Sequence, residues 1–169
     1  NFRPYLLPAA KERAIVAYEE SDGITGYRNT LEKDAMFGFL LAIEMVAVTG
    51  KNLGKYLREL EDEFGAYFPE RASIQVDRSL AGDPLTKKLS ILKAKLPVGS
   101  KVAIGKKTKI IKNVITVDGM KFVLEDNSWF LIRPSGTEPK VRFYVEPRTP
   151  DEIDAMVRMC ESLVKEALA

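Results

Sequence analysis

The residues of this sequence that are best suited to chemistry lie between Arg133 and Arg142. Between these two arginines stand Ser135, Gly136 and Thr137. A phosphate dianion is bound by guanidinium groups, hydroxyl donors and backbone N–H groups that approach closely, and glycine permits that approach because it has no Cβ. The segment therefore predicts a phosphate-binding loop. Its composition is also that of a plain polar hairpin turn, since Pro, Ser, Gly and Thr are frequent turn residues.

A second group of polar residues follows an apolar run at positions 14–18. Glu19 and Glu20 are neighbours, so on an extended chain their side chains point to opposite sides and form a poor acid/base pair. One carboxylate together with Ser21 could bind adjacent sugar hydroxyls, and the alternative is a solvated strand end. Lys33 lies near an expected helix start, where it would add to an anion site, and the alternative is a surface lysine.

Composition excludes several other kinds of chemistry. The 169 residues include no histidine, which excludes Ser-His-Asp catalysis, Cys-His catalysis and histidine metal ligands within this chain. The single cysteine, Cys160, excludes an internal disulfide, fits a cytoplasmic location and is expected to be a buried structural thiol. A net charge of +2 does not favour nucleic acid or an anionic membrane as a partner. No apolar run reaches the length of a membrane span, and we find no signal-peptide pattern.

The elements that precede the phosphate loop start with the apolar run at 14–18, which predicts a buried strand. A polar loop continues to about Thr30, the expected cap of a helix over about 31–49. Apolar residues at helical spacing predict this helix, and Gly50 suits its end.

A second helix is expected over about 53–64, with Asn52 as its cap and Gly65 as its stop. We place a domain boundary near residue 65, which divides the chain into residues 1–65 and residues 66–169.

Residues 66–169 are expected to combine a sheet with helices. Residues 73–77 alternate in polarity like a strand. Asp83-Pro84 predicts a helix start, with a capping side chain followed by proline at the first helical position. The apolar stripe of that helix is Leu85, Leu89, Leu92 and Leu96.

The remaining residues predict an antiparallel sheet and a final helix. Thr149-Pro150-Asp151-Glu152 combines a capping box with proline at the first helical position. Five lysines are expected to lie on a solvated strand face: Lys101, Lys106, Lys107, Lys109 and Lys112. Strands are predicted at 109–117, 120–124, 128–133 and 140–145, with turns at Asp118-Gly119 and Asp126-Asn127. This order predicts an α+β domain, a small antiparallel sheet of three or four strands after the first helix, with helices packed on one face.

The run Arg-Pro-Ser-Gly-Thr-Glu-Pro-Lys-Val-Arg-Phe-Tyr-Val-Glu from Arg133 resembles the phosphate-binding loop in the last domain of the α-D-phosphohexomutases. These are the phosphoglucomutases, phosphomannomutases and phosphoglucosamine mutases. Tyr18-Glu19-Glu20-Ser21 resembles the family's sugar-recognition loop, and Glu32-Lys33-Asp34 resembles its Glu-Lys-Asp-Gly motif at the next helix start. The resemblance covers essentially the whole chain. Tyr18 and Asp22 stand where the sugar loop usually has glycine, which leaves the preferred sugar open.

This resemblance implies an enzyme of four domains that interconverts hexose 1-phosphate and hexose 6-phosphate, of glucose or mannose, through a hexose 1,6-bisphosphate intermediate. Residues 1–65 would be the α/β end of domain three, and residues 66–169 would be domain four, with a TATA-box-binding-protein-like sheet. By resemblance, Glu19 and Ser21 bind the sugar. The substrate phosphate would be bound by Arg133, Ser135, Gly136, Thr137, Arg142 and Lys33.

The chain lacks the family's serine loop and its magnesium loop, so Mg²⁺ is expected to bind upstream and the chain alone is expected to be inactive. Its expected partners are a phosphosugar and the N-terminal domains of the same protein, with no nucleic acid and no membrane. The alternatives are a phosphoglucosamine mutase, whose sugar loop commonly has a glutamine, and a non-catalytic phosphosugar-binding module. A nucleic-acid-binding domain that uses the five lysines is a further rival.

Overall fold

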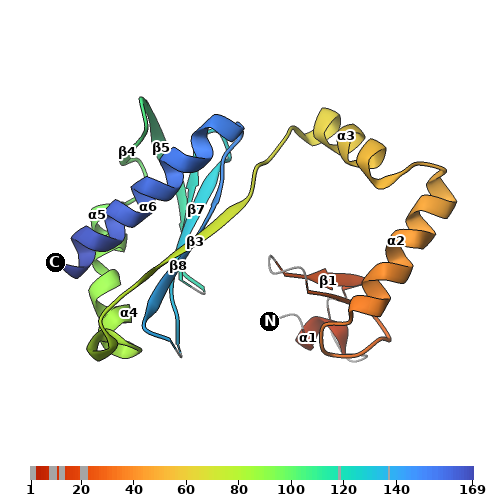
Figure 1. Ribbon diagram of the computed structural model, residues 1–169, viewed down its shortest axis with the longest axis horizontal. Helices are drawn as coiled ribbons and strands as arrows, with labels where there is room; N and C mark the ends of the chain where they lie inside the picture. Colours follow the sequence, from red (N-terminus) through yellow and green to blue (C-terminus); the bar gives the residue numbers. More distant parts are fainter. Residues whose placement is uncertain (1–2, 8–10, 12–13, 20–22, 118, 137) are drawn as a thin grey trace. The chain divides into compact units, whose positions relative to one another are not determined.

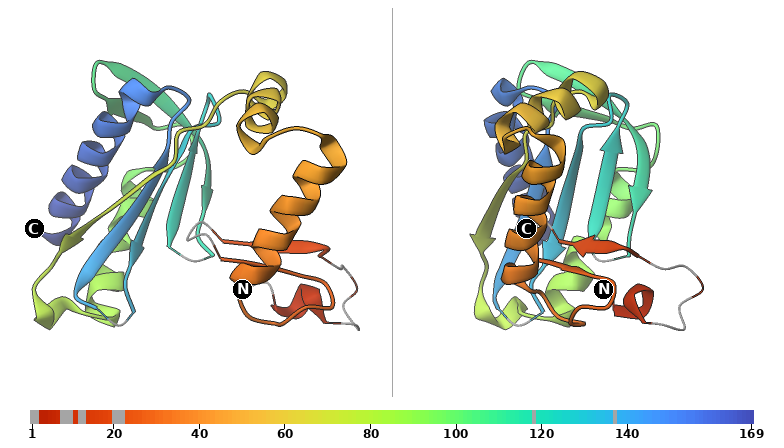
Figure 2. Two further views of the ribbon diagram at one scale, coloured as in Figure 1. Left: turned by 45° about the vertical axis from the view of Figure 1, so that its right-hand side comes forward. Right: turned by 90° about the vertical axis from the view of Figure 1, so that its right-hand side faces the viewer.

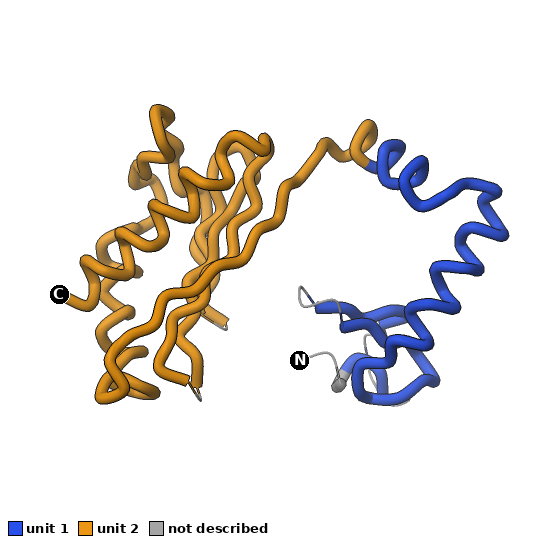
Figure 3. The backbone as a smooth tube through the Cα atoms, viewed as in Figure 1, with its two compact units in different colours: residues 1–60 blue, residues 61–169 orange. Residues whose placement is uncertain are grey.

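A computed structural model describes residues 3–7, 11, 14–19, 23–117, 119–136 and 138–169. The chain divides into two compact units, residues 1–60 and residues 61–169 (Figure 3). The division falls inside a helix, and the domain boundary that we expect near residue 65 stays a prediction.

The first unit begins with the short helix α1 (Arg3–Leu6) and an antiparallel hairpin of β1 (Val16–Tyr18) and β2 (Ile24–Gly26). The predicted strand is therefore present, but it is buried only at Ala17, and Tyr18 is 80% exposed. The prediction of a buried strand was wrong because, among the described residues, this strand pairs with a single neighbour and its outward side chains meet no second layer.

Two helices follow, α2 (Ala35–Thr49) and α3 (Leu53–Phe64). The cap of α2 is Asp34, whose Oδ1 accepts hydrogen bonds from the backbone N–H groups of Met36 and Phe37 at 2.9 and 3.1 Å. The helix thus starts later than predicted, and Asp34 rather than Thr30 is its cap. A hydrogen bond from Asn29, with those from the helix N–H groups, lowers the pKa of the Asp34 carboxyl.

Helix α2 is apolar around almost its whole circumference, yet none of its residues is buried within the part of the chain that the structure describes. Met36, Phe39 and Leu40 are 65%, 60% and 59% exposed. A helix that is apolar on every side is normally enclosed by other elements. Within the described part of the first unit, the apolar surface of α2 is therefore left uncovered.

Helix α3 begins and ends as predicted. The Asn52 side chain accepts a hydrogen bond from the Lys55 N–H at 2.8 Å, and Gly65 follows the helix with a φ of +82°. Among the described residues, no single helix is long and apolar enough to cross a membrane. The pair α2 and α3, taken together and bent by 78°, passes the test of length and composition alone.

The second unit is built on a six-stranded antiparallel sheet (Figures 1 and 2). The spatial order of the strands is β3-β8-β7-β6-β5-β4. The strand of this sheet that comes first in the chain, β3, therefore pairs with the one that comes last, β8. We did not predict β4, because it has only four residues, with Gly99 and Gly105 near its two ends. Only two of its side chains are apolar and buried, which is too short a pattern to indicate a strand. The strands are β3 (Glu70–Gln75), β4 (Lys101–Ile104), β5 (Lys107–Ile115), β6 (Met120–Leu124), β7 (Trp129–Pro134) and β8 (Lys140–Glu146).

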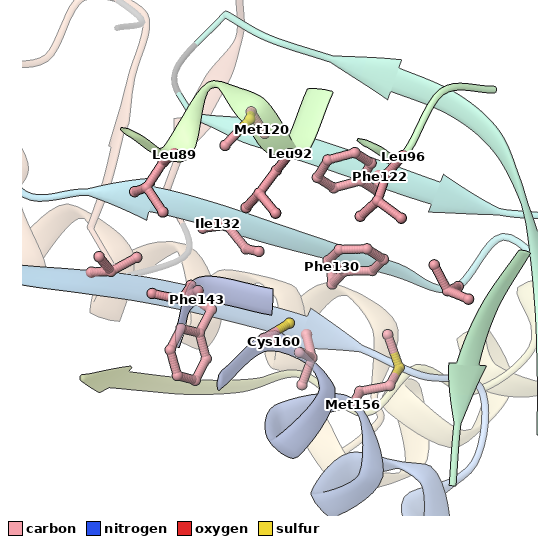
Figure 4. Close-up of a cluster of buried hydrophobic side chains, with 14 of the residues drawn as sticks. Leu89, Leu92, Leu96, Met120, Phe122, Phe130, Ile132, Phe143, Met156 and Cys160 are labelled. Atoms are coloured by element: carbon pink, nitrogen blue, oxygen red, sulfur yellow. The ribbon is translucent and has the colours of Figure 1, made fainter. Parts of the chain in front are cut away.

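One face of this sheet is covered by helices, which confirms the predicted α+β class (Figure 1). Apolar side chains form the core between the two layers, and the Phe122 and Phe130 rings stack at a centroid distance of 4.8 Å (Figure 4). Cys160 lies in this core, as expected for a structural thiol, and burial raises its pKa. The helical segments are η1 (Arg78–Leu80), α4 (Asp83–Leu89), α5 (Ile91–Lys95), η2 (Pro150–Glu152) and α6 (Ile153–Leu168).

The helix starts of this unit differ in detail from the predictions. The leucine stripe is buried as expected, but the helix that carries it is divided at Ser90 into α4 and α5, and Gly82 rather than Asp83 is the N-cap. The capping box predicted at Thr149 and Glu152 was also wrong, because no side chain caps this start. The Glu152 carboxylate is bonded elsewhere.

That carboxylate belongs to a cluster of charged groups at the edge of the core. Lys109 is only 7% exposed, and its Nζ lies 2.5 Å from Glu152 Oε2 and 2.6 Å from Asp126 Oδ2. Lys107 Nζ lies 2.7 Å from Glu152 Oε1. The prediction that Lys109 lies on a solvated face was therefore wrong. The two ion pairs of Lys109 connect β5 to the start of α6, through Glu152, and to the β6–β7 turn, through Asp126.

These ion pairs shift the pKa values of their members. Burial raises the pKa values of the carboxyl groups of Asp126 and Glu152, but hydrogen bonds from lysine, and at Asp126 also from Ser128, outweigh it and the net shifts are downward. Burial also opposes the charge of Lys109, and its bonds to both carboxylates outweigh that effect and raise its pKa.

We predict that Lys109→Ala lowers the free energy of unfolding of the second unit by about 2 kcal/mol near pH 7, because it removes the ion pairs of this buried lysine with Asp126 and Glu152 while Glu152 keeps its contact with Lys107. Urea unfolding followed by fluorescence of Trp129, the single tryptophan, measures the change. A lowered carboxyl pKa stabilises the fold above the ordinary pKa, and this contribution is lost as the pH falls through the folded-state value.

The difference between the two proteins should accordingly shrink as the pH falls below the ordinary carboxyl range and the carboxyl groups become protonated. The control is Lys107→Ala, which removes a more exposed lysine from the same cluster and should cost much less. If both substitutions lowered the free energy of unfolding equally, the burial of Lys109 would not be the cause of the lost stability.

Candidate functional site

The predicted phosphate loop connects β7 to β8 and is closed at its base by backbone hydrogen bonding. Pro134 lies opposite Val141 in the sheet register, and the Ser135 N–H donates to the Lys140 carbonyl at 2.9 Å. The Ser135 side chain is buried, and its Oγ accepts a hydrogen bond from the Glu138 N–H at 3.2 Å. This acceptance leaves the Ser135 hydroxyl proton able to donate to a ligand.

The two arginines of the loop are direct neighbours across the sheet. Arg133 and Arg142 are cross-strand partners in the β7–β8 register. The neighbouring pair, Ile132 and Phe143, is fully buried under the helices. Since successive side chains alternate between the faces of a sheet, both arginines lie on the face away from the helices. The two side chains thus start from paired positions on one face, from which both guanidinium groups could reach one anion.

Glu138 is bonded to the cations of this face. Its Oε2 accepts a hydrogen bond from Arg142 Nη2 at 2.7 Å and lies 2.9 Å from Lys140 Nζ. The hydrogen bond from Lys140 is the largest cause of a lowered pKa of the Glu138 carboxyl, and the charges of Lys140 and Arg142 add to it.

The backbone beside the loop is open on one side and tightly packed on the other. A Cβ placed on Gly136 would meet no atom within 4 Å, so this part of the loop is accessible to a ligand. Gly119, in the β5–β6 turn, has a φ of +87°, and a Cβ there would lie 2.8 Å from the Ile132 carbonyl oxygen. The turn therefore packs directly against the base of the phosphate loop.

A cavity of about 500 Å³ lies between the β5–β6 turn, the phosphate loop and α4. Arg133, Pro134 and Gly136 line it from the loop side, and Lys93 contributes a cation from α5. Arg142 and Glu138 are not among the residues that line this cavity, so it adjoins the loop on the side of α4 and α5.

Among the predicted phosphate-site residues, the structure brings together Arg133, Ser135, Gly136 and Arg142. Thr137 lies outside the described residues. Sequence reasoning did not assign Glu138 a role in the site. Its spacing from Lys140 and Arg142, two and four residues along the chain, was the available signal.

The predicted sugar-binding residues lie in the first unit. Lys33 Nζ lies 3.3 Å from Glu19 Oε1, so these two candidates form an ion pair, while Ser21 lies outside the described residues. A Cβ on Gly23 would overlap Lys33 Cδ at 2.1 Å, which shows that the lysine stem lies across this glycine. Glu19 and Gly23 also line a cavity of about 440 Å³. Lys33 is thus placed beside the Glu19 carboxylate and not in the phosphate loop's unit.

The described residues include no group of three or more His, Cys, Asp or Glu side chains that could hold a metal ion. The donor set of this part of the chain does not fit a magnesium site. The expectation that Mg²⁺ binds to an upstream part of the protein stays a prediction.

Comparison with known proteins identifies two adjacent domains. Residues 87–161 match the phosphoglucomutase/phosphomannomutase C-terminal domain, and residues 4–64 match the alpha/beta/alpha domain III of the same enzymes. The chain is 32% identical over 115 residues, 66% of its length and 23% of the relative's, to a phosphopentomutase of Thermococcus kodakarensis. It is 33% identical over 132 residues, 78% of its length and 25% of the relative's, to a probable phosphoglucosamine mutase of Methanosarcina barkeri.

Solved structures show the same relationship. A putative phosphomannomutase of Thermus thermophilus superposes with a TM-score of 0.61 at 26% identity, over 89% of this chain and 26% of that one. A phosphoglucomutase-like phosphoprotein of Paramecium, at 18% identity and a TM-score of 0.62, shows the same fold over 91% of this chain and 30% of that one. The chain spans about a quarter of the length of these relatives. The chain belongs to the α-D-phosphohexomutase family, and it matches the family's domain III and C-terminal domain over the residues given above.

Proposed function

We propose that this chain is the substrate-binding C-terminal part of a phosphohexomutase that interconverts hexose 1-phosphate and hexose 6-phosphate through a bisphosphate intermediate. The observation that carries the proposal is the cross-strand pair of Arg133 and Arg142 beside the open backbone of Gly136. Two adjacent guanidinium groups and accessible N–H groups suit a phosphate dianion.

In this proposal the second unit binds the phosphate that is not being transferred. Phosphoryl transfer depends mostly on positioning and on stabilising charge. A site that contacts only the phosphate accepts it on either carbon, so the same loop serves both orientations of the bisphosphate. Thr137 is included in the proposed loop because of the family motif.

The first unit is proposed to recognise the sugar through Glu19 and Ser21. In this proposal the ion pair with the Lys33 ammonium favours one orientation of the Glu19 side chain without fixing it. A carboxylate oriented in this way loses less freedom of rotation when it accepts hydrogen bonds from sugar hydroxyls. Lys33 in this proposal positions Glu19, in addition to its predicted role towards phosphate.

The catalytic serine and the Mg²⁺ site are proposed to lie in upstream domains, where Mg²⁺ would neutralise charge on the transferring phosphoryl group. In this proposal the chain alone is inactive. Its partners are those upstream domains and a phosphosugar, and neither nucleic acid nor a membrane has a role. The protein acts in the cytoplasm. A non-catalytic phosphosugar-binding module remains the alternative.

A glucosamine phosphate is the second candidate substrate. Besides the Methanosarcina barkeri relative, a probable phosphoglucosamine mutase of Methanosarcina acetivorans is 41% identical over 98 residues, 48% of this chain. The carboxylate of Glu19 suits an amino sugar as well as a hydroxyl group, because it accepts hydrogen bonds from either. Relative turnover of glucose, mannose and glucosamine phosphates by the full-length enzyme decides between them.

We predict that Arg133→Ala weakens binding of glucose 1-phosphate roughly tenfold to a hundredfold, since it removes a charge-assisted contact. Amide shifts of Ser135 and Gly136 during an NMR titration report the binding. The control is Arg158→Ala on the exposed side of α6, which should bind as the wild type does. Binding that Arg133→Ala leaves unchanged would favour a plain turn.

Alanine substitutions at two glycines separate binding from folding. Gly136→Ala should leave thermal stability unchanged and weaken phosphate binding, because its Cβ stands beside the N–H groups that approach the ligand. Gly119→Ala should destabilise the second unit by roughly 1–3 kcal/mol, because its φ is positive and its Cβ meets backbone. Unimpaired phosphate binding by Gly136→Ala would exclude close backbone approach.

We predict that Glu19→Gln weakens binding of hexose phosphates severalfold but leaves binding of inorganic phosphate unchanged, since a neutral amide is a weaker acceptor for hydroxyl groups. Calorimetry with both ligands measures the difference. Glu63→Gln, at an exposed position of α3, is the matched control. Equal losses for both ligands would assign Glu19 to phosphate rather than to sugar.

A further inference from the structure

Glu138 uses one carboxylate oxygen to contact two cations. Oε2 lies 2.7 Å from Arg142 Nη2 and 2.9 Å from Lys140 Nζ. Lys140 and Arg142 are two residues apart on β8, so their side chains lie on the same face of the sheet. The carboxylate thus occupies the position between two cations that a ligand oxygen could take.

The surrounding charges favour an anion at this position. Arg133 is the direct cross-strand neighbour of Arg142 on that face, and like charges placed opposite each other on a sheet are unfavourable. A negative charge between the cations offsets this repulsion. Glu138 supplies such a charge from within the chain.

The contact is arranged so that the carboxylate can leave while the loop stays in place. The Glu138 side chain is 47% exposed, against 37% for Arg142 and 22% for Lys140, so the carboxylate is the more solvent-exposed member of both pairs. Ion pairs at such exposure are weak. The backbone of Glu138 is fixed separately, because its N–H donates to Ser135 Oγ and its carbonyl accepts from the Lys140 N–H at 2.8 Å.

We propose that Glu138 is an internal counter-ion that a phosphate displaces from Arg142 and Lys140, and that this exchange makes the loop select dianions over monoanions. The inference rests on the proposed phosphate-binding function. A monoanion would only replace the single charge that Glu138 already provides. A dianion carries more charge and more acceptor oxygens, so it binds Arg142 and its neighbour Arg133 in one exchange.

Two ligands that differ by one methyl group test the selectivity. At about pH 8, methyl phosphate is a dianion and dimethyl phosphate is a monoanion. We expect the full wild-type chain to prefer methyl phosphate, and Glu138→Gln to bind dimethyl phosphate roughly tenfold more tightly, with a smaller ratio between the two affinities. NMR titration of the Gly136 amide gives both dissociation constants. Glu138→Ala should change the affinities in the same direction, which makes the test independent of how the glutamine side chain bonds.

The control is Glu161→Gln, which breaks an exposed glutamate–lysine pair on α6 and should leave both affinities unchanged. If Glu138→Gln weakens the binding of both ligands equally, or changes neither affinity, Glu138 only stabilises the loop structure and the inference is wrong. If wild-type protein binds neither ligand at millimolar concentration, the proposed phosphate-binding function itself fails. Trp129 fluorescence confirms that each variant is folded.

Discussion

Two arginines at paired positions on neighbouring strands are the constraint on which the proposed chemistry of the second unit depends. The β7–β8 register sets Arg133 opposite Arg142, and the buried pair beside them fixes which face they occupy. A slip of one residue in either strand would turn that strand's arginine towards the core and separate the pair. The apolar packing under the helices therefore determines the register and with it the proposed anion site. The Ser135 backbone bond to Lys140 then closes the loop over this pair.

The family motif predicted the position of the loop but not its internal arrangement. Arg133, Ser135, Gly136 and Arg142 were predicted as site residues because their types suit phosphate, and the structure brings them together. The cross-strand pairing of the arginines depends on register, which the two strand predictions alone did not specify. The role of Glu138 could not be seen because its two partners are known only once the strand places them on one face.

Regular hydrophobic patterns predicted most elements of the second unit, and the failures have particular causes. The leucine stripe of α4 and α5 is buried as expected, because helical spacing reports burial directly. Lys109 was assigned to solvent since a lysine in a strand is usually exposed, but two carboxylates distant in sequence surround it. In the first unit, α2 was predicted from the same kind of pattern, yet within the described part of that unit none of its residues is buried.

A double-mutant cycle on the two arginines tests the shared phosphate site most directly. Dissociation constants for glucose 1-phosphate are measured for wild type, Arg133→Ala, Arg142→Ala and the double variant, with folding checked by Trp129 fluorescence. If both guanidinium groups hold one phosphate, the loss in the double variant differs from the sum of the single losses by about 1 kcal/mol or more. Strictly additive losses, or no loss from either substitution, would contradict a phosphate held by both arginines.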